Sequence, residues 1–294
     1  MKRPRLRLAE VGPRDGLQSA GAAVGTDAKV AFVDALSQSG LREIEVGAFV
    51  SPKAVPEMAD SGEVFSRIKR KPGVVYSALI PNAQGLEAAL AAKADKAAVF
   101  TAASETFNKK NINASIAESI ERFAPVIPAA KAKGLPVRGY VSTAFFCPYE
   151  GKIEPRAVLE VVKRLRVDEY SIGDTIGRAA PDDVRRLLDV LLSFVPVEKI
   201  FLHFHDTYGM AVANALTAWQ EYDVSGFDAS TGGVGGCPYA PGASGNVAME
   251  DLVFAFEACG GETGVDVKVL QAAGRELCKA MGRPPASRLS KINL

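Results

Sequence analysis

The strongest constraint on the fold of this chain is a regular alternation of short β-rich runs with amphipathic helical stretches from end to end. Strands that alternate with helices in this way form parallel sheets, because each helix returns the chain to the same end of the sheet. Eight such units in 294 residues fit an α/β fold of the (β/α)8 TIM-barrel type better than an open doubly wound sheet. The eight expected strands are Leu6–Val11, Glu43–Phe49, Val74–Ile80, Ala97–Thr101, Val137–Thr143, Glu169–Ile172, Ile200–Phe204 and Gly226–Ser230.

Helical periodicity is clearest in four segments between or after these strands. A proline and two acidic residues precede one of them, which is typical of a first helical turn. One more helical region follows about Gly260, and we find no linker or internal repeat. We therefore expect one catalytic TIM-barrel domain over residues 1–294 with an extra C-terminal helical segment. The four segments are Lys29–Ser39, Val184–Phe194, Ala211–Tyr222 and Asn246–Cys259.

Composition excludes several classes of partner. The net charge is +1 and 23% of the residues are charged, so no electrostatic footprint indicates nucleic acid or an anionic membrane surface. No signal-peptide-like apolar region or spanning segment is visible, and we expect a cytoplasmic protein. The four cysteines are scattered without a CxxC pair, which favours thiols over disulfides or a thiolate zinc site.

The two histidines of the chain, His203 and His205, stand two positions apart on one expected strand. Their side chains therefore share a face, and both imidazoles can reach a single metal ion. Two partly buried, hydrogen-bonded histidines are the structural alternative. Acidic residues at neighbouring strand ends favour the metal site, because the chemistry of a TIM barrel lies at the carboxyl ends of its strands.

Further candidates follow the other strands. Asp15, after the first strand, can supply a third ligand, although Pro-Arg-Asp-Gly is also a strong turn sequence. Asn246 can add an amide oxygen. This mixed nitrogen and oxygen set suits Mg²⁺ or Mn²⁺ and leaves Co²⁺ and Zn²⁺ open. Arg14 can hold a developing enolate or carboxylate oxygen, and Glu45, in an apolar strand, needs a partner such as Arg14.

The glycine-rich stretch Thr231–Asn246 lacks the spacing of a phosphate-binding or dinucleotide loop. We interpret it as a mobile lid that delivers Cys237 to the site on closure, although an inert cysteine in a loop is the simpler alternative.

Seven segments, in order and at matching spacing, resemble the 3-hydroxy-3-methylglutaryl-CoA lyase family, which belongs to a metal-dependent lyase superfamily built on a TIM barrel. They are VGPRDGLQ (Val11–Gln18), FVSPKAVPEM (Phe49–Met58), KKNINASIAES (Lys109–Ser119), CPYEGKI (Cys147–Ile153), GDTIG (Gly173–Gly177), HDTYGMAVAN (His205–Asn214) and GGCPYAPGASGNVAMEDL (Gly235–Leu252).

The resemblance implies a divalent cation, Mg²⁺ or Mn²⁺, at a site formed by four ligands. It also implies a set of catalytic residues, with Arg14 and Gln18 in contact with the substrate. The implied ligands are Asp15, His203, His205 and Asn246. The implied catalytic residues are Arg14, Asp15, Glu45, Asp174, His203 and Cys237.

The implied reaction is cleavage of 3-hydroxy-3-methylglutaryl-CoA to acetyl-CoA and acetoacetate, as in leucine degradation and ketone-body formation. The implied partner is an acyl-CoA thioester, and we expect a homodimer. The alternatives are another 3-hydroxyacyl-CoA substrate, a condensing enzyme of the isopropylmalate synthase type, and a catalytically silent barrel. Some apolar exchanges relative to the family pattern bear on the acyl group; they lie at Ala48, Phe145, Phe146, Phe204, Met210 and Met249.

Overall fold

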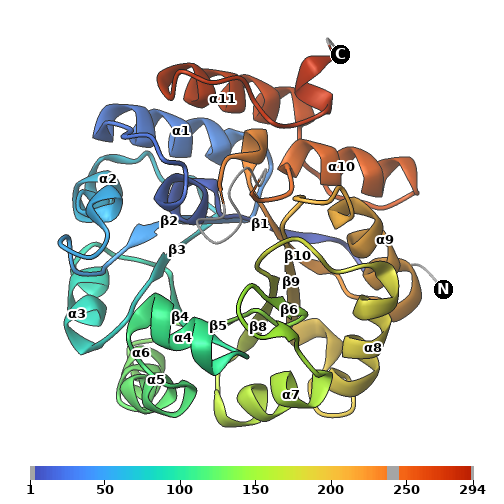
Figure 1. Cartoon of the computed structure of the whole chain (residues 1–294). Coiled ribbons are helices and arrows are strands. Elements are labelled where there is room, and N and C mark those ends of the chain that lie inside the picture. Colours follow the sequence, from blue (N-terminus) through green and yellow to red (C-terminus); the bar gives the residue numbers. More distant parts are fainter. Residues whose placement is uncertain (1–3, 237–244, 293–294) are drawn as a thin grey trace.

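Eight parallel strands close into a barrel in which the last strand pairs with the first (Figure 1). The computed structural model describes residues 4–236 and 245–292. The predicted (β/α)8 barrel is confirmed, and each expected strand coincides with one barrel strand. The barrel strands are β1 (Arg7–Glu10), β2 (Glu43–Ala48), β3 (Val75–Leu79), β4 (Lys96–Ala102), β5 (Val137–Ser142), β8 (Glu169–Asp174), β9 (Ile200–Phe204) and β10 (Gly226–Ala229).

A small antiparallel pair, β6 (Phe146–Cys147) and β7 (Gly151–Lys152), lies outside the barrel. Helices surround the barrel, and apolar side chains between the two layers form the core. The helices are α1 (Thr26–Gln38), α2 (Ser61–Arg67), α3 (Ala83–Ala91), α4 (Glu105–Ile112), α5 (Ile116–Phe123), α6 (Val126–Ala132), α7 (Pro155–Arg164), α8 (Pro181–Leu191), α9 (Ala211–Tyr222), α10 (Met249–Ala258) and α11 (Val267–Ala280).

The expected helix at Asn246–Cys259 begins later than predicted, at Met249. The backbone before it is extended instead, because Val247 donates to the carbonyl oxygen of Phe204 at 3.1 Å and accepts from the amide of Ser230 at 3.0 Å. These bonds hold residues 245–248 against the ends of β9 and β10.

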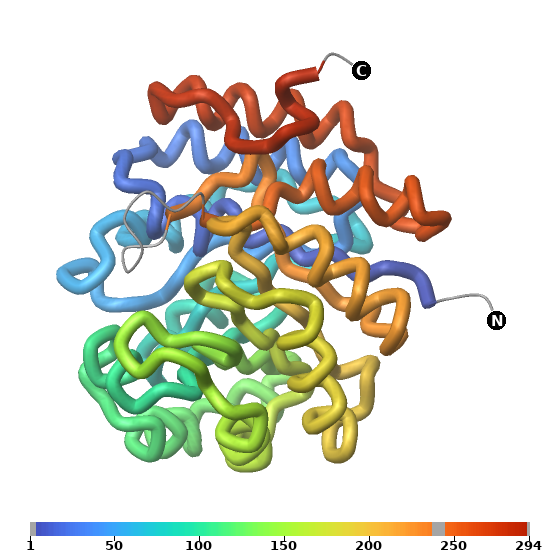
Figure 2. Tube along the Cα trace, turned by 45° about the vertical axis from the view of Figure 1, so that its right-hand side comes forward, coloured from blue at the N-terminus to red at the C-terminus, as the bar shows by residue number. Residues whose placement is uncertain are grey.

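The predicted C-terminal helical segment is present as α11. It packs against α1, and Figure 2 shows this red segment lying over the first, blue helix. The extra helix therefore covers the β1 side of the barrel.

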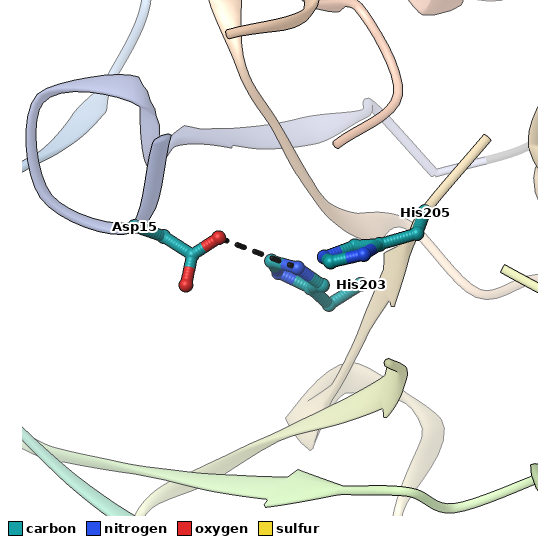
Figure 3. A group of neighbouring side chains, drawn as sticks. All are labelled: Asp15, His203 and His205. Carbon is teal, nitrogen blue, oxygen red and sulfur yellow. Dashed lines mark ion pairs between the residues drawn. The ribbon is translucent and has the colours of Figure 1, made fainter. Parts of the chain in front are cut away.

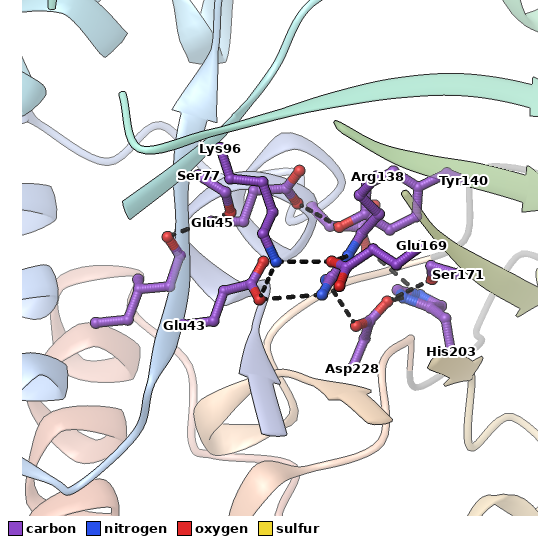
Figure 4. A network of polar contacts seen from close by, with 12 residues as sticks. Glu43, Glu45, Ser77, Lys96, Arg138, Tyr140, Glu169, Ser171, His203 and Asp228 are labelled. Carbon is purple, nitrogen blue, oxygen red and sulfur yellow. Dashed lines mark hydrogen bonds and ion pairs between the residues drawn. The ribbon is translucent and has the colours of Figure 1, made fainter. Parts of the chain in front are cut away.

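The barrel interior carries a network of buried charges (Figure 4). Arg138 of β5 donates to Glu169 at 2.7 Å and to Glu43 and Asp228 at 3.1 Å. Lys96 of β4 bonds to Glu43 at 2.8 Å and to Glu169 at 2.7 Å. Because each buried charge has an opposite partner, the network avoids the cost of an isolated ion inside the barrel.

Within the described ranges, the helices are too short or too polar to cross a membrane.

Candidate metal centre and active site

Two of the candidate residues stand on a single π-helical turn, Gly12–Gly16, that follows β1. The two glycines of this turn are required by close packing. A Cβ atom at Gly12 would lie 2.6 Å from Oε1 of Glu10, and one at Gly16 would lie 2.7 Å from the carbonyl oxygen of Val234. The turn directs Arg14 and Asp15 toward the barrel axis.

The two histidines come from the carboxyl end of β9 and face Asp15 (Figure 3). Oδ2 of Asp15 lies 4.0 Å from Nε2 of His203. One ligand atom from each of Asp15, His203 and His205 lies within 4.8 Å of the other two, so a single small cation can contact all three. The three residues therefore form a possible metal-binding triad.

Asn246 lies beside this triad because its extended segment bridges His205. Its Nδ2 donates to Oδ2 of Asp15 at 2.9 Å and to the carbonyl oxygen of Val234 at 3.3 Å. Its Oδ1 and Nδ1 of His205 are buried and have no hydrogen-bond partner among the described residues. Buried polar atoms normally have partners, so these two atoms fit a cation ligand set. Two imidazoles, one carboxylate and one amide oxygen suit a divalent cation.

The electrostatics hold two members of the triad, Asp15 and His205, in the forms that bind a cation. Burial raises the pKa of Asp15, but the Arg14 guanidinium and the two imidazoles outweigh it and lower that pKa to about 2. Burial, assisted by His203, lowers the pKa of His205 to about 4. At neutral pH, Asp15 is thus a carboxylate and His205 a neutral imidazole, the forms that bind metals.

Arg14 is fixed by two carboxylates. Its Nε donates to Oε2 of Glu45 at 2.7 Å, and its Nη1 donates to Oδ1 of Asp15 at 3.0 Å. Burial lowers the pKa of Arg14, but Glu45 and Asp15 outweigh it, so the pKa lies above its usual range. The expected pairing of Glu45 with Arg14 is present, and it holds the guanidinium next to the metal triad.

Sequence reasoning missed two residues that support this arrangement. Tyr140 of β5 donates to Oε2 of Glu45 at 3.1 Å, and the Arg14 guanidinium lies 5.2 Å from the centre of its ring. Asp228 of β10 lies 3.5 Å from Nδ1 of His203 and accepts from Ser171 at 2.5 Å. A carboxylate behind a ligating histidine fixes the ring orientation. The sequence signal was available, because Asp228 is a charged residue within an apolar strand.

The other predicted site residues are placed differently. Gln18 lines the same cavity as Arg14. Asp174 is fully buried and accepts backbone N–H groups from Arg178 at 3.1 Å and Ala179 at 2.9 Å, so it braces the loop after β8. It is absent from the cavity wall within the described ranges. Cys237 lies outside the described residues.

The metal triad opens into a cavity of about 440 Å³. Its polar end includes Arg14, Asp15, His203 and His205, and its other walls are largely apolar. The exchanges that were expected to bear on the acyl group do not form part of the described wall. Phe204, for example, is buried and packs against Phe145 with ring centres 6.1 Å apart.

The fold and this site define a TIM-barrel protein with a candidate divalent-metal centre at the carboxyl ends of its strands. The HMGL-like family profile matches residues 5–276, and the chain belongs to this family.

The chain is similar to the mitochondrial hydroxymethylglutaryl-CoA lyase of Bos taurus, with 49% identity over 290 residues that cover 98% of this chain and 89% of the relative. It is 48% identical, over 99% of this chain and 97% of the relative, to the 3-hydroxy-3-isohexenylglutaryl-CoA/hydroxy-methylglutaryl-CoA lyase of Pseudomonas aeruginosa. The crystal structure of hydroxymethylglutaryl-CoA lyase from Pseudomonas aeruginosa superposes with a TM-score of 0.96 at 48% identity, covering 99% of this chain and 98% of the other.

Proposed function

We propose that this chain cleaves 3-hydroxy-3-methylglutaryl-CoA to acetyl-CoA and acetoacetate with the help of Mg²⁺ or Mn²⁺. The observation that carries the proposal is the cluster of Asp15, His203 and His205, whose ligand atoms lie within 4.8 Å of one another. The Arg14 guanidinium is 3.0 Å from the same aspartate. The names of relatives at 48% and 49% identity support the same activity.

The cation ligands and Arg14 have different proposed roles in the cleavage. Asp15, His203, His205 and Asn246 would hold the cation, which when bound supplies positive charge that acidifies the tertiary hydroxyl of the substrate. Arg14 donates to the thioester oxygen, where charge develops as the C2–C3 bond breaks and the acetyl-CoA half leaves as an enolate.

Two further side chains keep Arg14 in position. Oε2 of Glu45 accepts from both Arg14 and Tyr140, so the guanidinium is oriented before substrate binds. Preorganised donors are effective because they need no rearrangement as the transition state forms.

Proton transfer needs a base for the hydroxyl and an acid for the enolate. His203 and Asp15 remain the two candidate bases, because both border the cavity. We propose Cys237, or a neighbouring carboxylic acid, as the acid that completes acetyl-CoA. For Asp174, the backbone bonds to Arg178 and Ala179 favour a positioning role in the loop after β8.

The test is a product assay with the purified full chain. Incubation of 3-hydroxy-3-methylglutaryl-CoA with Mg²⁺ should give equal amounts of acetyl-CoA and acetoacetate, and a chelator should stop the reaction until Mn²⁺ or Mg²⁺ is added back. Failure to form acetyl-CoA under these conditions would rule the proposal out.

The same preparation separates the alternatives. A condensing enzyme would consume acetyl-CoA and a 2-oxo acid, and a silent barrel would bind no Mn²⁺ in calorimetry. We also propose that the chain is a cytoplasmic homodimer. Its proposed binding partner is an acyl-CoA thioester, and it should bind neither nucleic acid nor a membrane surface. Sedimentation of the purified chain measures its oligomeric state directly.

A further inference from the structure

The chain after α11 folds back onto the start of the glycine-rich stretch. Ala286 donates its backbone N–H to the carbonyl oxygen of Gly232 at 2.8 Å, and Arg283 donates its backbone N–H to the carbonyl oxygen of Cys278 at 3.0 Å. The first bond ties this segment to the glycine-rich stretch, and the second ties it to the last turn of α11. The backbone of Arg283 is therefore held on both sides.

The guanidinium of Arg283 links two backbone segments that border the metal triad. Its Nη1 donates to the carbonyl oxygen of Ala20 at 3.3 Å, and its Nη2 donates to the carbonyl oxygen of Gly235 at 3.3 Å. The first carbonyl belongs to the chain that leaves the turn of Asp15, and the second belongs to the glycine-rich stretch. Hydrogen bonds from a charged donor are stronger than those from a neutral one, so one side chain can hold the two segments together.

The glycine-rich stretch packs directly against Asn246 at this point. A Cβ atom at Gly235 would lie 3.0 Å from Nδ2 of Asn246 and 3.1 Å from its backbone nitrogen, so glycine permits this close approach. Val234, one residue earlier, accepts from the same Nδ2 at 3.3 Å. On the other side, a Cβ atom at Gly236 would lie 2.4 Å from the carbonyl oxygen of Ser19. A shift of these three glycine-rich residues would therefore move a hydrogen-bond acceptor of Asn246.

The orientation of the Asn246 amide decides which of its atoms is open to a cation. Its Nδ2 donates both to Oδ2 of Asp15 and to the carbonyl oxygen of Val234. Its Oδ1 is buried and has no hydrogen-bond partner among the described residues. The two acceptors on the nitrogen thus leave the oxygen free to act as a metal ligand, and loss of one acceptor would loosen that orientation.

We propose that Arg283 is a positioning residue that acts on the bound cation through Asn246. By linking Gly235 to Ala20, its guanidinium fixes the stretch that carries the Val234 carbonyl. That carbonyl in turn keeps Oδ1 of Asn246 available to a divalent cation. The inference rests on the proposed function and adds a supporting residue to its metal site.

The experiment is a double-mutant cycle on Mn²⁺ affinity, measured by isothermal titration calorimetry of the full chain. Arg283→Met removes both donors and should weaken Mn²⁺ binding about tenfold, the lower end of the range for residues behind a ligand. In the Asn246→Ala background, the same exchange should change the affinity by less than about twofold, because the residue through which it acts is already gone. A general loss of structure would instead weaken binding equally in both backgrounds.

Arg283→Lys keeps one charged donor and should lose less affinity than Arg283→Met. It takes the place of Arg283→Met in the cycle if that variant does not fold, and its loss should likewise vanish in the Asn246→Ala background. The matched control is Arg275→Met, at an exposed arginine of α11 that also donates to a backbone carbonyl, that of Ser290, at 3.4 Å. This control should leave the Mn²⁺ affinity unchanged.

An unchanged Mn²⁺ affinity in Arg283→Met would overturn the inference. Equal losses in the two backgrounds would also overturn it, because Arg283 would then act on something other than Asn246. Both results would leave the proposed function intact, since the product assay tests that function on the wild-type chain. If the wild-type chain binds no Mn²⁺, the inference and the proposed metal site fail together.

Discussion

Asn246 and His205 lie side by side across a backbone bridge, although α9, β10 and the glycine-rich stretch separate them in sequence. The bridge exists because residues 245–248 pair with the ends of β9 and β10 rather than starting α10. Nδ2 of Asn246 is bonded to Asp15 at 2.9 Å, so its Oδ1 is directed away from that bond. The pairing thus places a buried amide oxygen beside the triad, where it is a candidate fourth ligand atom.

We expect His205→Ala to weaken Mn²⁺ binding about 100-fold or more, because it removes a proposed direct ligand. The loss should exceed the roughly 10–100-fold effect that is usual when a residue behind a ligand is changed. Isothermal titration calorimetry of the folded variant measures this loss. Asp228→Asn, which alters the carboxylate behind His203, should weaken binding by about 10–100-fold. Ser171→Ala is the matched control for loss of the hydrogen bond to Asp228, and its effect should be smaller. An unchanged Mn²⁺ affinity in His205→Ala would remove His205 from the ligand set.

Arg14→Gln should lower kcat by about 10²–10³-fold or more, since it removes a charged donor aimed at the developing enolate. Mn²⁺ should still bind, because the triad atoms remain. Steady-state kinetics at saturating Mg²⁺ and a Mn²⁺ titration separate the two effects. Glu45→Gln is the control that keeps Arg14 but neutralises its partner, and it should cost less. Near-normal turnover in Arg14→Gln would disprove the enolate role.

The fold was predictable because the eight β-rich runs and the helices between them repeat with a clear period. The clustering of the three candidate metal ligands was predictable for a related reason: His203 and His205 share a strand face, and barrel geometry brings Asp15 to the same rim. Asn246 was expected to be near the start of a helix, and only the structure showed the extended pairing that positions it.

The supporting residues were harder to predict because their roles depend on contacts across the barrel. Tyr140 acts through Glu45 on another strand, a contact that no local pattern reveals. Asp228 is marked in the sequence as a charged residue within an apolar strand, but the pattern does not show that it faces His203 on the neighbouring strand. Asp174 belongs to the GDTIG segment that resembles the family, yet its carboxylate accepts hydrogen bonds from backbone amides and does not line the described cavity wall. The apolar exchanges noted in the sequence also lie away from the described cavity wall, whereas Leu79 and Phe100, which line it, drew no attention.

Arg138→Met should destabilise the chain by about 3–5 kcal/mol, because it leaves buried carboxylates of Glu43, Glu169 and Asp228 without their main partner. Urea unfolding followed by circular dichroism gives the free energy of unfolding. Arg185→Met is the control: that guanidinium pairs with two carboxylates at the surface, and its loss should change stability little. A similar stability for the two variants would show that the interior network contributes nothing.

The last prediction concerns Glu10, a fully buried carboxyl group between the β1 turn and the start of the glycine-rich loop. It accepts from the amide of Gly12 at 2.7 Å and from the amide and hydroxyl of Thr231 at 3.0 and 2.5 Å, while Glu250 of α10 adds like charge nearby. Burial raises the pKa of Glu10 to about 7 and outweighs these hydrogen bonds. Between its ordinary pKa of about 4.5 and this value, the folded chain binds more protons than the unfolded chain. The Glu10 contribution to stability is therefore complete below about pH 4.5 and is lost as the pH rises through about 7.

Relative to Glu10→Gln, the wild-type chain should lose free energy of unfolding across this window, by at most about 1.4 kcal/mol per pH unit. Urea unfolding at several pH values measures the difference, and Glu87→Gln, at an exposed position on α3, should show none. A wild-type chain that gained stability over Glu10→Gln as the pH rose would mean that the hydrogen bonds from Gly12 and Thr231 keep Glu10 ionised.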